Sequence, residues 1–146
     1  QWGGARNMTF MLQKEVCQRL CANVGDKHYG RLAILRACYA RADYLFEVPP
    51  SAFNPPPKVD SAIIRLTPLA NPEVEVLSLD RLEQVTAAAF GQRRKTLRNS
   101  LSALIDEAGL IELGIDPKQR AENLSPQAFA DIANALERSD GSALPH

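Results

Sequence analysis

The segment most suited to chemistry is SAFNPPPKVDSAIIRL, residues 51–66, in which an aromatic residue precedes three prolines. The prolines, residues 55–57, fix three φ angles and remove three backbone donors. A stiff, extended loop loses little entropy when a ligand docks on it. Phe53 is suited to stacking on a flat ring such as a nucleobase. Beside it, Asn54 offers a donor and an acceptor, Pro55 offers rigidity and Lys58 offers a cation.

Two other interpretations of this loop stay open. Phe53 can plug the edge of a sheet while the prolines prevent edge pairing, and on physical grounds alone this structural role ranks first. The prolines can also be a ligand for the aromatic groove of a partner protein.

The second candidate is the basic segment FGQRRKTLRNSL, residues 90–101. It carries four cations within six residues: Arg93, Arg94, Lys95 and Arg98. On a helix Arg94 and Arg98 would share one face, and no acidic residue lies between Glu83 and Asp106. Most charge runs are solvated helix faces, but this run, with its amide and hydroxyl neighbours, favours phosphate binding.

Composition restricts the class of protein. With 146 residues, 45% hydrophobic, and 17 basic against 17 acidic side chains, the chain is typical of one or two small globular domains. No apolar run approaches the roughly 20 residues that span a bilayer, so no membrane partner is expected. The first residues resemble no signal peptide, which predicts a cytoplasmic location. Because the sequence starts at Gln1 and not at Met, we expect a processed or truncated piece.

The three cysteines, Cys17, Cys21 and Cys38, could form a metal site with His28. However, a Cys-x3-Cys pair with one more cysteine and one histidine does not have the spacing of a zinc site. We therefore expect no metal, and reduced cysteines that act as small buried hydrophobic residues.

Hydrophobic periodicity predicts an α/β half followed by an all-helical half. Residues 8–12, 44–48 and 61–66 have the composition of strands, and residues 15–22 and 31–39 show helical spacing. Prolines and the lack of periodicity mark a linker near residues 71–78. The predicted organisation is thus an incomplete α/β domain over residues 1–70, this linker, and a helical domain over residues 79–146.

The helical half shows three apolar stripes, near residues 79–90, 97–105 and 129–136. The pairs Ser125-Pro126 and Asp116-Pro117 each predict a helix start, with a capping side chain before a first-turn proline. Two strands and one separate strand do not make a satisfactory parallel sheet. Further strands are therefore expected before Gln1, and the exposed sheet edge could also self-associate.

Five segments occur together in one order: FMLQKEV (10–16), YGRL (29–32), VPPSAFNPPPKVDSAIIRL (48–66), FGQRRKTLRNSL (90–101) and RAENLSPQAFADIANAL (120–136). In these segments the chain strongly resembles the bacterial small-subunit ribosomal RNA adenine N6,N6-dimethyltransferases, over residues 8–136. The resemblance implies the closing part of a class I, Rossmann-like methyltransferase sheet followed by a small helical domain.

The resemblance also implies a function. Such enzymes use S-adenosylmethionine to dimethylate N6 of two adjacent adenines in small-subunit ribosomal RNA. It assigns target-adenine stacking to Phe53, substrate binding to Asn54, Pro55 and Lys58, and RNA binding to the four cations of the basic segment. The expected partner is the small ribosomal subunit or its RNA.

Two features of the family are absent from these 146 residues: a glycine-rich cofactor loop and an Asn-x-Pro-Tyr motif. We therefore expect this chain alone to bind no S-adenosylmethionine and to be inactive, as the C-terminal portion of the enzyme. Two alternatives stay open. The chain could be a non-catalytic RNA- or ribosome-binding module, or a degradation or crystallisation product without activity.

Overall fold

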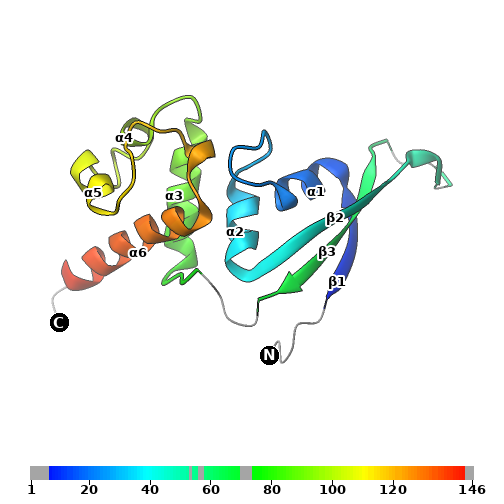
Figure 1. The fold of residues 1–146 in the computed structure, drawn as a ribbon, viewed down its shortest axis with the longest axis horizontal. Helices are drawn as coiled ribbons and strands as arrows, with labels where there is room; N and C mark the ends of the chain where they lie inside the picture. Colours follow the sequence, from blue (N-terminus) through cyan, green and yellow to red (C-terminus); the bar gives the residue numbers. More distant parts are fainter. Residues whose placement is uncertain (1–6, 53, 56–57, 70–73, 144–146) are drawn as a thin grey trace.

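A small antiparallel sheet, two helices on one of its faces and a group of further helices make up the fold (Figure 1). The computed structural model describes residues 7–52, 54–55, 58–69 and 74–143. Of residues 141–143 it describes the backbone only. The strands are β1 (Met8–Gln13), β2 (Ala40–Val48) and β3 (Ser61–Pro68). The helices are α1 (Lys14–Cys21), α2 (Arg31–Tyr39), α3 (Leu79–Gly91), α4 (Leu97–Ser100), α5 (Glu107–Glu112) and α6 (Pro126–Ala143), with short 3₁₀ turns η1 (Pro50–Ala52) and η2 (Ala121–Asn123).

The sheet has the strand order β1-β3-β2, and β3 pairs antiparallel with both neighbours. Its period-2 pattern places Ala62 and Ile64 on the face that α1 covers, where both are fully buried. All three predicted strands are confirmed, although β2 begins four residues earlier than its apolar run and contains an irregularity between Tyr44 and Phe46.

The two faces of the sheet differ in cover. On the covered face, Cys17 of α1 packs with Ala62 and Ile64 in a small core. On the other face, the strand register aligns Met11, Ile63 and Phe46 in one row across the sheet. Met11 is 50% exposed and Phe46 58% exposed, so this row is an apolar surface.

The larger core joins the two sides of the predicted linker. Ala33, Ile34 and Cys38 of α2 pack in one cluster with buried residues of α3 and α6. The segment before α2 also takes part, because the buried hydroxyl of Tyr29 donates to the Leu124 carbonyl oxygen at 2.6 Å. Figure 1 shows α2 lying between the sheet and the helices α3 and α6. The division into two domains stays a prediction, but helix α2 contacts both parts.

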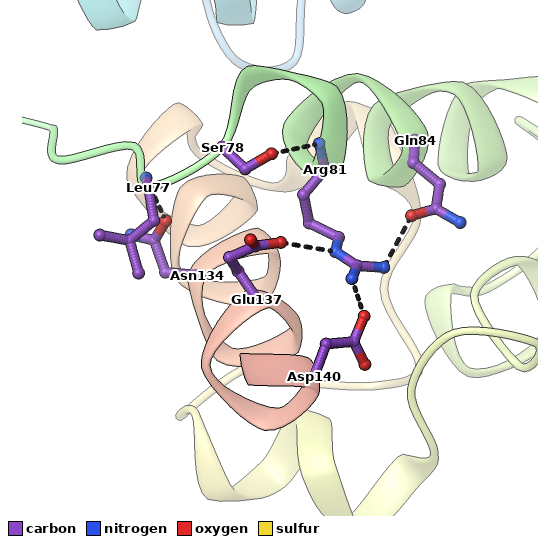
Figure 2. A network of polar contacts seen from close by, with 7 residues as sticks. All are labelled: Leu77, Ser78, Arg81, Gln84, Asn134, Glu137 and Asp140. Carbon is purple, nitrogen blue, oxygen red and sulfur yellow. Dashed lines mark hydrogen bonds and ion pairs between the residues drawn. The ribbon is translucent and has the colours of Figure 1, made fainter. Parts of the chain in front are cut away.

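Residues 74–78 of the predicted linker are held against α6 (Figure 2). Asn134, which is almost fully buried, accepts from the Leu77 amide at 2.9 Å and donates to the Glu75 carbonyl at 2.7 Å. Beside it, Arg81 of α3 forms ion pairs with Glu137 and Asp140 of α6. These contacts fix the entry to α3, whose amino end is capped by the Ser78 hydroxyl.

The helical part differs from its prediction in three places. Residues 93–95 lie in a turn between α3 and α4 and not on a helix, so Arg94 and Arg98 do not share a helix face. The predicted helix over residues 97–105 ends at Ser100, and Asp116-Pro117 forms a turn in which Asp116 accepts from the Lys118 amide. The Ser125-Pro126 prediction is confirmed: α6 starts at Pro126, and the Ser125 hydroxyl accepts from the Ala128 amide at 3.1 Å.

The three cysteines are free; Cys17 and Cys38 are buried as predicted, whereas Cys21 is half-buried. Burial raises the pKa of all three thiols. Within the described ranges, no three His, Cys, Asp or Glu side chains are grouped as metal ligands would be. None of the helices in the described part of the chain is long and apolar enough to cross a membrane.

Candidate nucleic-acid interface

The proline loop connects β2 to β3 at the far end of the sheet from the helices α3 to α6 (Figure 1). Phe53, the predicted stacking residue, lies outside the described residues, as do Pro56 and Pro57. Asn54, Pro55 and Lys58 are exposed. The predicted roles of these four residues therefore stay predictions.

Both ends of this loop are fixed by the fold. At its start, the Ala52 amide donates to the Pro49 carbonyl at 3.0 Å within η1. At its end, the Asp60 carbonyl accepts from the Lys14 amide at 2.9 Å, which ties the loop to the first residue of α1. The Lys14 ammonium is 3.0 Å from a Glu47 carboxylate oxygen, and the hydrogen bond to Glu47 raises the pKa of Lys14. A polar hollow beside Lys58 includes Lys14 and Asp60.

The four cations of the basic segment lie in different surroundings. Arg93 is held by the fold: its guanidinium donates to the Lys27 carbonyl at 3.2 Å and to the Tyr29 carbonyl at 2.5 Å. It also lies over the Phe90 ring, 5.2 Å from the ring centroid. Arg93 therefore joins the α3–α4 turn to the loop before α2, across the predicted domain boundary.

Arg98, on α4, forms an ion pair with Glu107 at 3.3 Å. Arg94 and Lys95 are exposed in the turn, and neither forms an ion pair or a side-chain hydrogen bond with the described part of the chain. Of the four predicted RNA-binding residues, these two are the ones available to an external phosphate without breaking an internal contact.

A cleft that the sequence did not indicate lies between α1, α2 and α3. It has a volume of about 570 Å³, and its polar and charged lining residues are Arg19, Lys27, His28, Arg31, Glu83 and Arg93. These residues come from four separate segments, so no local pattern in the sequence could identify the cleft. Its one sequence signal is the YGRL segment, whose Gly30, Arg31 and Leu32 line the wall.

The charge of this cleft is unfavourable for the sulfonium of S-adenosylmethionine. The sulfonium of that cofactor is a cation, and four cationic side chains against the single Glu83 carboxylate would repel it. The Glu83 carboxylate is moreover paired with Arg31 at 2.5 Å. The charge of the cleft is suited to an anion instead.

Comparison with known proteins gives one consistent result. Residues 2–138 match the family model described as "Ribosomal RNA adenine dimethylase". The chain is 50% identical, over 130 residues, to the ribosomal RNA small subunit methyltransferase A of Methylococcus capsulatus, covering 89% of this chain and 50% of that protein. It is 49% identical to the protein of that name from Salmonella typhimurium, covering 91% of this chain and 49% of that protein. The chain thus spans about half the length of the curated relatives it matches.

Solved structures agree on the fold. A dimethyladenosine transferase from Plasmodium falciparum superposes with a TM-score of 0.77 at 26% identity, covering 92% of this chain and 58% of that one. The 23S rRNA methyltransferase ErmE superposes with a TM-score of 0.60 at 24% identity, covering 90% and 55%, and shows similarity of fold alone. The predicted fold class, the closing part of a class I methyltransferase sheet followed by helices, is confirmed.

Proposed function

Because this chain belongs to the ribosomal RNA adenine dimethylase family, we propose that it is part of a methyltransferase that acts on small-subunit ribosomal RNA. In this proposal the complete enzyme uses S-adenosylmethionine to dimethylate N6 of two adjacent adenines, in the cytoplasm. The family match over residues 2–138 carries the proposal. The 146 residues contain neither the glycine-rich loop nor the Asn-x-Pro-Tyr motif, so we further propose that this chain alone does not transfer methyl groups.

The proline loop would hold the target base. A base must leave its stack to be methylated at an exocyclic amine, and Phe53 would stack on it while Asn54, Pro55 and Lys58 contact the nucleotide. The hydrogen bonds at Ala52 and Asp60, which fix both ends of the loop, support this role because a positioned loop loses less entropy on binding.

The α3–α4 turn would dock the RNA backbone. Arg94 and Lys95 support this because both are exposed cations without an internal partner in the described residues. Arg93 would contribute mainly by positioning the turn, since its guanidinium is engaged with two carbonyls. Arg98 would bind a phosphate less strongly, because its guanidinium is already paired with the Glu107 carboxylate.

A second candidate function is a non-catalytic RNA- or ribosome-binding module. The basic turn favours it, because the turn lies within these 146 residues while the family's cofactor loop does not. Binding to small subunits without methyl transfer, even when the amino-terminal half of a relative is supplied, would support this second function.

The test is methyl transfer from labelled S-adenosylmethionine to unmethylated small ribosomal subunits. This chain would be assayed beside a chimera in which it follows the amino-terminal half of the Methylococcus capsulatus relative. We expect activity in the chimera only. Activity in neither would favour the binding module, and activity in this chain alone would refute the proposed division of the enzyme.

Self-association through the sheet edge also remains a proposal. Within the described residues β1 and β2 each pair with one strand only, β3, and the other edge of each strand supports this proposal. Sedimentation velocity at increasing concentration would test it: a sedimentation coefficient that rises with concentration is expected, and a constant monomer value would exclude it.

A further inference from the structure

We propose that the cleft between α1, α2 and α3 is a second site for RNA phosphates, in which Lys27, His28 and Arg31 bind the backbone. The cleft lies apart from the proline loop, and Lys27, His28 and Arg31 belong to neither predicted set of site residues. The inference rests on the proposed function, because it takes RNA as the ligand.

The charge of the cleft carries this inference. Arg19, Lys27, Arg31 and Arg93 line it, and Glu83 is the only acidic residue among the lining residues of the described chain. The protein as a whole has a net charge of zero. When Glu15, which pairs with Arg19, is counted as well, four positive charges stand against two negative charges. This local excess of positive charge on a neutral protein is suited to an anion.

The available cations can be separated from the engaged ones. Arg19 forms an exposed pair with Glu15 at 3.1 Å, and Arg31 pairs with Glu83 at 2.5 Å. The ammonium of Lys27 and the imidazole of His28 have no partner among the described residues. Lys27 is therefore the cation most available to a phosphate. Arg31 has several N–H donors, so it can bind Glu83 and a phosphate oxygen at the same time.

The loop that carries Lys27 and His28 is fixed at several points. Arg93 donates to the carbonyls of Lys27 and Tyr29, and the Gly25 amide donates to the Glu122 carbonyl at 2.8 Å. The Tyr29 side chain is buried in the larger core. The backbone on both sides of His28 is thus positioned before any ligand arrives, which lowers the entropy cost of binding.

The cleft is contiguous with the α3–α4 turn, because Arg93 lines the cleft and Arg94 and Lys95 follow it in the chain. An RNA strand that contacts the turn can continue along the cleft to Lys27 and Arg31. This path makes RNA the preferred ligand over a free phosphate ion, since a polyanion gains from each further cation. The RNA would then contact both sides of the predicted linker.

The experiment measures the affinity of the 146-residue chain for unmethylated small ribosomal subunits as a function of salt. The variant is Lys27→Glu, and the control is Arg41→Glu, at an exposed cation that lies 3.8 Å from the Asp43 carboxylate. Arg41 lies just beyond the carboxyl end of α2, away from Arg31 at its amino end. Both variants change the net charge by the same amount, and both side chains are exposed.

We expect Lys27→Glu to lower affinity about tenfold at moderate salt, because the new carboxylate repels the RNA phosphates. Affinity should also become less sensitive to salt, because one phosphate contact is lost. Between about 50 mM and about 200 mM salt, the variant should lose affinity by a factor about 3.5 times smaller than the unaltered chain does. Arg41→Glu should change affinity less than about twofold. Lys27→Ala, which removes the charge without reversing it, should give the same reduction in salt dependence.

Three outcomes separate the inference from the proposed function. Salt-dependent binding by the unaltered chain with an equal response of Lys27→Glu and Arg41→Glu would overturn the cleft site and leave the proposed function intact. Absence of binding by the unaltered chain would overturn both. A selective loss in Lys27→Glu and Lys27→Ala, with unchanged melting temperatures, would support the cleft as an RNA site.

Discussion

Replacing Arg93 by alanine should destabilise the protein, although Arg93 lies in an exposed basic turn. Its guanidinium links α3 to the loop before α2 through hydrogen bonds to the Lys27 and Tyr29 carbonyls and through its contact with the Phe90 ring. In the alanine variant these two carbonyls lose a charged donor and the ring loses its cation. Arg94→Ala is the matched control, because the adjacent Arg94 has no such contacts within the described chain.

The expected loss follows from these three contacts. A hydrogen bond to a charged group contributes about 1.5–3 kcal/mol when buried, and solvent exposure of Arg93 reduces each to about 0.5–1 kcal/mol. The cation–π contact adds about 0.5–1 kcal/mol at an exposed site. The free energy of unfolding should therefore fall by about 2 kcal/mol, which corresponds to about 4–8 °C in melting temperature for a chain of this size.

Thermal unfolding followed by circular dichroism measures this difference. Arg93→Ala should melt about 4–8 °C below the unaltered protein, and Arg94→Ala should melt within about 1 °C of it. Arg93→Lys should recover little of the loss, because an ammonium cannot reproduce the forked geometry of the guanidinium. Equal melting temperatures for Arg93→Ala and Arg94→Ala would refute the structural role of Arg93.

Three further predictions concern single side chains. Tyr29→Phe should lower the free energy of unfolding by about 1 kcal/mol in urea titrations at pH 7, because the hydrogen bond to the Leu124 carbonyl is lost. Because burial raises the pKa of Tyr29 in the folded state, this stabilisation should persist below pH 10 and decline above it. A difference between the two proteins that grew at high pH would contradict the assignment. Asn134→Ala should cost about 2 kcal/mol in the same titration, since the buried amide satisfies two backbone groups of residues 75–77, and a loss below about 0.5 kcal/mol would show that water replaces it. In the active chimera, Phe53→Ala should lower turnover more than RNA affinity, because stacking positions the extruded base; unchanged turnover would exclude that role.

Regular elements with strong local signals were predictable from the sequence. The strands appeared as short apolar runs, and the start of α6 was marked by Ser125-Pro126, because a capping hydroxyl before a proline favours that conformation locally. Asp116-Pro117 carries the same signal, yet it forms a turn because its carboxylate binds the Lys118 amide two residues later. A local signature therefore indicates a turn or a helix start, and the following residues decide between them.

The basic segment shows why the site was harder to predict. Its charges suggested one helix face, but α3 ends at Gly91 and the chain turns, so the four cations point to different surroundings. The hydrogen-bond partners of Arg93, Lys27 and Tyr29, precede it in the sequence by 66 and 64 residues. Such long-range contacts depend on the packing of α2 against α3 and leave no local pattern, and the same is true of the cleft.

The most direct test of the central claim, that this chain supplies RNA-docking residues to a ribosomal RNA methyltransferase, is its salt-dependent binding to unmethylated small ribosomal subunits. The logarithm of affinity should fall linearly with the logarithm of salt concentration, and Arg94→Glu with Lys95→Glu should reduce the slope by about 2, one unit for each lost phosphate contact. An unchanged slope in the double variant would contradict the account, because the α3–α4 turn would then be only a solvated surface.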